Sequence, residues 1–411
     1  MLRKGRTGVY ARTGALLGPA FVAAIAYVDP GNVAANITAG AKYGYLLVWV
    51  LVLANAIAVM VQYQSAKLGI VTGRTLPQTL GDRLPQKSRL AYWAQAELVA
   101  GATDIAEVIG GAVALYLLFG LPLPVGGLIV GVVAIVLLTT ANRRRQRQFE
   151  TIIVGLLAII VVGFLAGLVV SPPDAGGVLG GLVPRLDGSE TVLLAASMLG
   201  ATVMPHAIYL HSSLVIDRHG EPTTRQRTRK LLSITKVDVW IALALAGVVN
   251  IALLVLAATS LYGREGTDSI EGAHAAVRDA LGPVVAGAFA VGLLASGIAS
   301  TSVGSYAGGA IMAGMLRKQL PMIVRRSVTL VPAIIILAAG LDPTTALIVS
   351  QVVLSFGIPF AIIPLRRYTS NKAMMGDFVD GPWLRWASAA AVVAVVVLNA
   401  ALIVLTVNGS G

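Results

Sequence analysis

A carboxylate stands inside the first apolar stretch of the chain, in the run Asp29-Pro30-Gly31-Asn32. In the hydrocarbon of a bilayer such a charge costs about 2.5–3.5 kcal/mol on insertion scales. Proline and glycine beside it break the helix that would satisfy the backbone, and membranes tolerate such a break only where it lines a cavity or faces a ligand. The Asp29 carboxylate, the Asn32 amide oxygen and freed carbonyls suit a hard or borderline cation. Helix N-capping is the alternative role, and in mid-membrane we favour the functional one.

A second apolar segment breaks in the same way at Met204-Pro205-His206. Pro205 has no backbone N–H and moves the preceding residue out of helical geometry. The thioether of Met204 is a soft ligand, which favours transition metals over Ca²⁺ and Mg²⁺, although a lone methionine more often packs in a core. The carbonyl of Ala201, one turn earlier, is a further candidate ligand. Two broken segments in two halves predict a substrate site at the bilayer midplane.

His206 follows the second break directly. A histidine can bind metal or carry protons near neutral pH, or it can simply be a hydrogen-bonded core residue. In a helix, Met204 and His206 would point about 200° apart, so they would not face the same ion. We therefore favour a role for His206 in proton transfer.

Three acids lie in the third apolar segment, at Glu97, Asp104 and Glu107. Spacings of seven and three residues place them on one helical face. Acids in a membrane helix are costly unless solvated or paired, and proton relays in transporters have this pattern. Arg325 and Arg326 are candidate partners. A static buried ion network is the alternative.

Other polar residues in apolar segments have less specific roles. Gln351 could join helices or supply an oxygen ligand, and Asn250 has the same two alternatives. Asp238 and Lys236, near one end of the seventh segment, are candidates for an inner-gate ion pair.

The composition indicates a polytopic membrane protein without a separate soluble domain. The 411 residues are 56% hydrophobic and 12% charged, with a mean hydropathy of +0.82, whereas soluble domains are about 45–50% apolar and about 25% charged. The net charge of +12 lies in short links between apolar segments, which indicates membrane topology rather than nucleic-acid binding. The lack of cysteine excludes disulfides, thiolate metal sites and iron–sulfur clusters. Neither a phosphate-binding loop nor a His-Glu-x-x-His motif occurs, which argues against an ATP-driven pump and a zincin-type protease.

Eleven membrane segments are predicted, the first interrupted at Asp29 and the sixth at Met204. Their predicted bounds are Thr13–Gly40, Tyr45–Val71, Leu90–Phe119, Leu121–Thr140, Phe149–Val170, Thr191–Ile216, Leu232–Leu261, Pro283–Leu316, Val324–Gly340, Thr344–Pro364 and Pro382–Val407.

Lysine and arginine concentrate in alternate links, which predicts a cytoplasmic N-terminus and an external C-terminus. The first and second sets of five segments have the same layout in opposite orientations. We therefore predict a single transmembrane domain, residues 1–411, with a first repeat at 13–170, an inverted repeat at 191–364 and an eleventh helix at 382–407.

The paired motifs resemble those of the Nramp (natural resistance-associated macrophage protein) divalent metal transporters, whose bacterial members include the MntH-type manganese transporters. The resemblance covers nearly the whole chain and extends to Gly-Pro-Ala at 18–20, Ala-Thr-Asp-Ile-Ala-Glu at 102–107 and Ser-Gln-Val at 350–352. It implies an all-α LeuT-type fold and proton-coupled import of Mn²⁺ and Fe²⁺ across a bacterial inner membrane by alternating access. It implies no cofactor, no nucleic acid and no obligate protein partner.

The resemblance also implies residue roles. The implied metal ligands are Asp29, Asn32, the Ala201 carbonyl and Met204, joined in some conformations by the Ala26 carbonyl and the Gln351 side chain. The implied proton-path residues are Asp29, Glu107, His206, Asp104 and Arg326.

Three other functions compete with this one. A Mg²⁺ or non-metal transporter could share the fold, but Mg²⁺ gains nothing from the thioether of Met204. A passive channel could also contain broken helices, but the inverted layout and the row of acids favour alternating access. An intramembrane enzyme would need a nucleophile–base pair, and we identify none.

Overall fold

The structure is a computed structural model that describes residues 18–140, 155–156, 158–159, 161–162, 164–165, 167–169, 171–220, 224–318 and 320–407. Throughout these ranges the regular secondary structure is helical, with no strand. Seven helical spans in this part of the chain are long and apolar enough to cross a membrane, and Pro19–Val28 and Leu123–Val136 are shorter apolar helices.

The first predicted segment is broken where the sequence indicates. Helix α2 (Pro19–Ile25) tightens into the 3₁₀ turn η1 (Ala26–Val28), and α3 (Pro30–Tyr43) begins after Asp29. Asp29 has extended backbone geometry, with φ −84° and ψ 167°, and its side chain accepts a hydrogen bond from the backbone N–H of Asn32. The N-cap geometry therefore occurs, and it occurs at a residue buried in the protein.

The sixth segment is broken in the same manner. Helix α10 (Gly188–Thr202) ends before Met204, which is the extended N-cap of α11 (Pro205–His219), with φ −64° and ψ 119°. The restriction that proline places on its preceding residue explains this geometry.

The other predicted segments that fall on described residues are each helical, with ends that differ by a few residues. Half of Phe149–Val170 lies outside the described residues, and its described positions up to 169 are helical. The remaining elements are α4 (Val48–Thr72), α5 (Leu76–Arg83), α6 (Gln86–Phe119), α7 (Leu123–Thr140), α9 (Ala175–Gly180), α12 (Arg225–Ser260), α13 (Ile270–Leu281), α14 (Pro283–Leu316), α15 (Met322–Ala338), α16 (Pro343–Thr369), α17 (Lys372–Met375), η3 (Gly376–Phe378) and α18 (Pro382–Val407).

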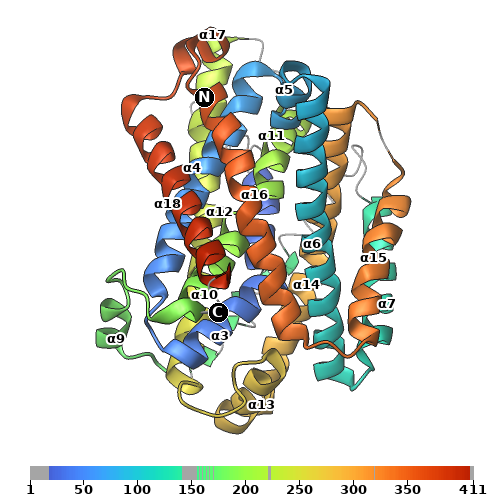
Figure 1. Cartoon of the computed structure of the whole chain (residues 1–411), viewed down its shortest axis with the longest axis vertical. Helices are drawn as coiled ribbons and strands as arrows, with labels where there is room; N and C mark the ends of the chain where they lie inside the picture. The colour runs from blue at the N-terminus through green and yellow to red at the C-terminus, as the bar shows by residue number, and fades with distance from the viewer. Residues whose placement is uncertain are drawn as a thin grey trace, which may run out of the picture.

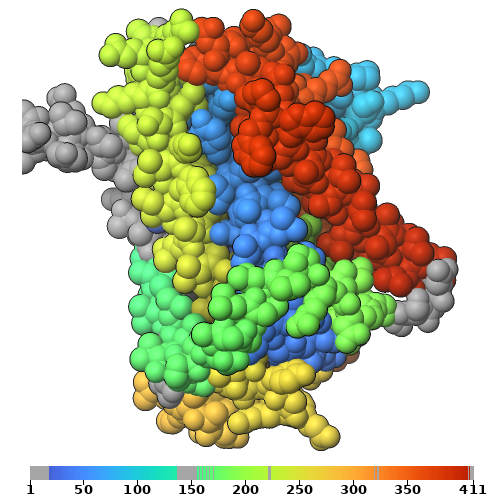
Figure 2. Space-filling view, turned by 90° about the vertical axis from the view of Figure 1, so that its left-hand side faces the viewer, coloured from blue at the N-terminus to red at the C-terminus, as the bar shows by residue number. Residues whose placement is uncertain are grey.

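The two broken helices lie inside a bundle formed by the others. Helix α3 packs on α12 and α16, and α10 packs on α16 and α4. Figure 1 shows α7 and α15 together at one edge and α18 at the opposite edge, with α5 and α17 at one end and α9 and α13 at the other. From the side, α12 and α18 cover the bundle and leave part of α4 visible between them (Figure 2).

Glycines allow the close approach of α16 to both breaks. A Cβ atom at Gly31 would lie 1.8 Å from Gln351 Nε2, and one at Gly200 would lie 2.0 Å from the Gln351 carbonyl oxygen. A side chain at Gly200 would require α16 to move, because the clash is with its backbone, whereas one at Gly31 would displace the Gln351 side chain. The packing therefore brings Gln351 beside both interruptions.

Candidate metal site

The two breaks meet at the side chain of Asn32. Its Nδ2 donates hydrogen bonds to Asp29 Oδ1 and to the carbonyl oxygen of Ala201, each at 2.8 Å. All three groups are buried, with exposures of 0%. One atom thus bridges the carboxylate of the first break and a backbone carbonyl of the second, 169 residues away in sequence.

Proline frees a carbonyl in each broken helix. In a regular α-helix the Ala201 carbonyl would accept a hydrogen bond from residue 205, and the Ala26 carbonyl from residue 30. Both of those residues are proline, which has no N–H to donate. The Ala201 carbonyl instead contacts Asn32. Ala26 lies in η1, directly before the first break.

Gln351 supplies a further amide to the same place. Its Nε2 donates to Asp29 Oδ2 at 3.1 Å, and its Oε1 is buried without a hydrogen-bond partner. An unpaired buried acceptor is costly, and it lies next to a buried carboxylate. Thr202, which sequence reasoning missed, donates to Asn32 Oδ1 at 3.3 Å.

Met204 lies at the second break with a fully buried side chain. The site therefore gathers a carboxylate, two amides, a freed carbonyl and, three residues after that carbonyl, a thioether. Oxygen and sulfur donors in this combination suit a borderline divalent cation better than Ca²⁺ or Mg²⁺.

The row of acids on α6 meets both arginines of α15. Arg325 Nη2 lies 2.6 Å from Glu97 Oε1, and Arg326 Nη1 lies 3.0 Å from Asp104 Oδ1. Both contacts join the partners that the sequence suggested. Glu107 is 1% exposed, and Thr301 and Arg326 lie close to its carboxylate.

His206 lies between the metal-site residues and α6. Its Nδ1 is 3.4 Å from Thr103 Oγ1, the residue before Asp104, and its Nε2 is buried without a partner. The second break is therefore in contact with the helix that carries the acids.

The expected ion pair of Asp238 with Lys236 is not present. Asp238 is buried and accepts hydrogen bonds from the backbone N–H groups of Gly18 and Ala20 at the start of α2, whereas Lys236 is exposed. Side chains two residues apart on a helix point about 200° apart, which explains the difference. Asp238 thus ties α12 to the first half of the first broken helix.

Asn250 also contacts the first broken helix. Its Nδ2 donates to the Tyr27 carbonyl at 2.7 Å, and its Oδ1 accepts from Asn36 Nδ2 at 3.2 Å. These bonds satisfy the polar groups of the break, so Asn250 supports the site rather than facing it.

The sequence analysis did not identify a buried hydrogen-bonded group that contains His211 and Gln62. His211, five residues after His206 in the same apolar segment, places Nδ1 2.7 Å from Gln62 Oε1, and Gln62 Nε2 donates to the Tyr27 hydroxyl. The sequence signal that could have identified His211 is its position in the same apolar segment as His206.

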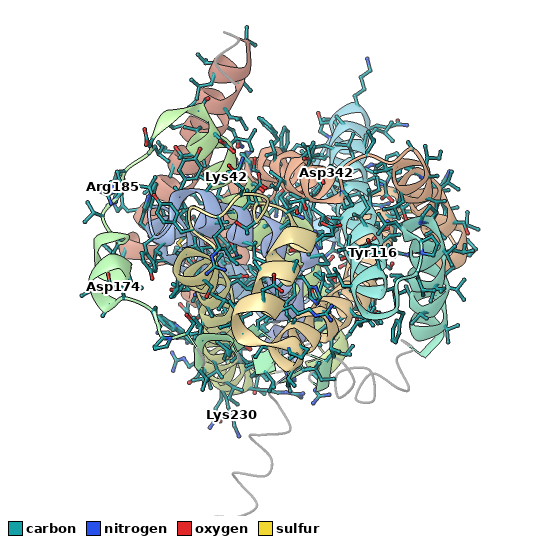
Figure 3. The ribbon with its side chains drawn as sticks, turned by 90° about the horizontal axis from the view of Figure 1, so that it is seen from below. Lys42, Tyr116, Asp174, Arg185, Lys230 and Asp342 are labelled. Atoms are coloured by element: carbon teal, nitrogen blue, oxygen red, sulfur yellow. The ribbon has the colours of Figure 1, made fainter. Side chains whose placement is uncertain are left out.

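At the end that carries α9 and α13, Lys42 Nζ lies 2.7 Å from Glu190 Oε1 and 3.5 Å from Asp268 Oδ2. This cluster joins α3, α10 and the segment before α13. In Figure 3, which looks onto this end, Asp174 and Arg185 flank the outlying α9, and Lys42 lies nearer to the bundle.

Comparison with known proteins indicates a single protein family. The family described as natural resistance-associated macrophage protein-like matches residues 20–405. A divalent metal cation transporter MntH of Mycobacterium tuberculosis is 58% identical over 394 residues, covering 96% of this chain and 92% of that protein. The MntH of Bacillus subtilis is 45% identical and covers 95% and 92%.

Solved structures agree at the level of the fold. The Eremococcus coleocola manganese transporter, solved as a point mutant in which alanine replaces a histidine, superposes with a TM-score of 0.86 at 32% identity over 97% of this chain and 87% of that one. Mhp1, a nucleobase-cation-symport-1 family transporter, superposes with a TM-score of 0.62 at 18% identity, covering 94% and 90%. The latter similarity concerns the fold alone.

Proposed function

This chain belongs to the natural resistance-associated macrophage protein family and is a multi-pass membrane protein, and on that premise we propose that it is a divalent metal transporter that imports Mn²⁺ and Fe²⁺ together with protons. Relatives that bear the name divalent metal cation transporter, with identities of 44–58%, support a transporter rather than an enzyme. The Lys/Arg distribution supports a cytoplasmic N-terminus and an external C-terminus.

The observation that carries the proposal is the contact between the two breaks. Asp29 and Ala201 share the Nδ2 of Asn32 at 2.8 Å each, and Gln351 Nε2 donates to the other oxygen of Asp29. Rotation of the Asn32 amide by about half a turn would present Oδ1 where Nδ2 now stands. A divalent ion could then take the place of the donated hydrogens, with oxygen ligands from Asp29, Asn32 and Ala201.

Met204 completes the proposed ligand set and provides selectivity. Its thioether gives a transition metal a favourable partner and offers nothing to Ca²⁺ or Mg²⁺, which prefer oxygen. The Ala26 carbonyl and the Gln351 side chain are proposed to join in other conformations. Alternating access would follow from rocking of the halves around this central site.

Proton coupling follows from competition at Asp29. A bound divalent cation favours the ionised carboxylate, so metal binding releases a proton there. His206, in contact with Thr103, leads from the site to α6. Glu107, Asp104 and Glu97, with Arg326 and Arg325, then provide exchangeable sites toward the end that carries α5.

Uptake into proteoliposomes tests the site. We expect Asp29→Ala to abolish Mn²⁺ uptake and metal-driven acidification of the lumen, because it removes the only anionic ligand of the proposed set. The measurement uses Mn²⁺ flux and a lumenal pH dye in the same vesicles. Asp279→Ala, at an exposed position on α13, is the matched control and should transport normally. Uptake by Asp29→Ala equal to that of the control would refute the site.

A further inference from the structure

Three arginines lie in the turns where α16 ends and α18 begins, and two of them are in contact. Arg366 and Arg367 lie in the last turn of α16, and Arg385 lies in the first turn of α18. Arg366 Nε donates to the Arg385 carbonyl oxygen at 3.2 Å, which places the two residues side by side. Among the described residues, no carboxylate lies within ion-pair distance of any of the three. We call this place the α16–α18 corner.

The acids of the adjoining loop already have other partners. Asp380 lies 2.7 Å from Lys67 Nζ and also accepts from Gln64, while Asp377 pairs with Arg225. The positive charge of the α16–α18 corner is therefore not neutralised by its own loop. An anion from outside the chain would relieve the repulsion between the arginines.

Two buried donors at the corner lack acceptors. Arg385 Nε and Ser370 Oγ are both buried without a hydrogen-bond partner. They lie close together, because Arg385 Nη2 donates to the Ser370 carbonyl at 3.4 Å. The Asp380 N–H donates to the Thr369 carbonyl at 3.0 Å and holds the two chain segments against each other. Unpaired buried donors carry a free-energy cost that an oxygen acceptor removes.

Exposed tryptophans show where the corner lies relative to the bilayer. Trp383 and Trp386, on either side of Arg385 on α18, are 83% and 75% exposed. Tryptophan concentrates at the level of lipid headgroups in membrane proteins. Helix α18 continues from here as an apolar span, and the red spheres of α17 and α18 run from the top of the molecule down its right side in Figure 2. An anion at this level is most simply a lipid phosphate.

We propose that the α16–α18 corner binds the headgroup of an anionic phospholipid such as phosphatidylglycerol. Arg385 Nε and Ser370 Oγ donate to the phosphate oxygens, Arg366 and Arg367 neutralise its charge, and the tryptophans contact the glycerol and upper acyl region. Guanidinium groups suit this role because they bind phosphate through two parallel donors. The site is separate from the metal site, and the proposal does not depend on the transported ion.

Lipid retention measured by native mass spectrometry tests the proposal. The delipidated full-length protein is incubated with equal amounts of phosphatidylglycerol and phosphatidylcholine, and bound lipid is counted. We expect preferential retention of phosphatidylglycerol by the unaltered protein. Ser370→Ala should weaken it about tenfold or more, because one hydrogen bond to a charged group is lost. Since Ser370 Oγ has no partner within the described part of the chain, this variant should fold normally.

Two further measurements test the proposal: a pair of arginine variants and a competition with inorganic phosphate. Arg385→Gln should lose the preference, whereas Arg229→Gln, which removes the same charge from an exposed position on α12, should keep it. An excess of inorganic phosphate should not displace the lipid. Unchanged retention in Ser370→Ala and Arg385→Gln, equal retention of both lipids, or displacement by inorganic phosphate would each overturn the proposal.

Discussion

Asn32 is the residue through which the two broken helices contact each other. Its amide can present either a donor or an acceptor toward the same point, and its present partners are two oxygens that suit a cation. Asp29 supplies charge and Ala201 supplies a carbonyl. Met204 differs from these in kind, because sulfur contributes to selectivity among ions more than to the binding of divalent ions in general.

Selectivity can be tested at Met204. We expect Met204→Ala to retain measurable Mn²⁺ transport while Ca²⁺ and Mg²⁺ compete more strongly, because the soft ligand that disfavours them is gone. Mn²⁺ uptake is measured against increasing Ca²⁺ in the same vesicles. Met198→Ala, at a fully buried methionine of α10 away from the break, controls for the loss of packing. If both variants have the wild-type Ca²⁺ competition, Met204 serves only in packing.

At the scale of elements, the approach of α16 to the breaks positions the site. Gly200 on α10 faces the backbone of Gln351, and the clash of an added Cβ would be with backbone rather than with a movable side chain end. The same helix then supplies the Gln351 amide to Asp29. The geometry of the site thus depends on Gly200, although this residue is not one of the proposed metal ligands.

Gly200→Ala should therefore destabilise the protein and impair uptake. The Cβ would lie 2.0 Å from the Gln351 carbonyl oxygen, so α10 and α16 must separate, at a cost of about 1–3 kcal/mol. Thermal unfolding in detergent and Mn²⁺ uptake are the measurements. Gly287→Ala, in α14 with no atom within 4 Å of the added Cβ, is the control and should be neutral or stabilising. Equal unfolding temperatures for the two variants would contradict the close packing.

The positions of the breaks could be predicted because proline and hydropathy act locally. Pro30 and Pro205 each remove one helical hydrogen bond and disfavour helical geometry in the residue before them. Because Pro332, Pro359 and Pro364 lie inside helices, proline alone does not predict a break, and the polar residues beside Pro30 and Pro205 were the second signal. The partner of each acid depends instead on how helices are rotated against one another. Arg325 and Arg326 could be identified as partners of the α6 acids, but Asp238 proved to cap α2, which pattern alone does not reveal.

At the scale of the whole molecule, α6 connects the centre to one end. Glu97 and Glu107 are ten residues apart, a rise of about 15 Å along the helix. Helix α6 packs on α14, α15 and α16 and also meets α11, where His206 lies. In the proposed proton path, a continuous helix with acids along one side connects the central site to that end.

Glu107→Gln should weaken the link between proton and metal movement more than it weakens metal affinity. Glu107 is buried, so an amide of nearly the same size fits the space but cannot exchange a proton. Mn²⁺ influx and lumenal acidification are recorded in the same vesicles. Glu271→Gln on α13 is the control. Unchanged influx with unchanged acidification would mean that the α6 acids form a static network.

Pro30 and Pro205 also affect the step in which a transporter returns without its ion. Because neither proline can ever donate, the Ala26 and Ala201 carbonyls lack their helical partners in every state of the protein. A helix that ran through either proline would still lack that hydrogen bond, as α15 and α16 do at Pro332, Pro359 and Pro364. In the proposed site the Asn32 amide donates to the Ala201 carbonyl and so satisfies it. On this proposal, an arriving ion meets two carbonyls that no helical hydrogen bond has to release.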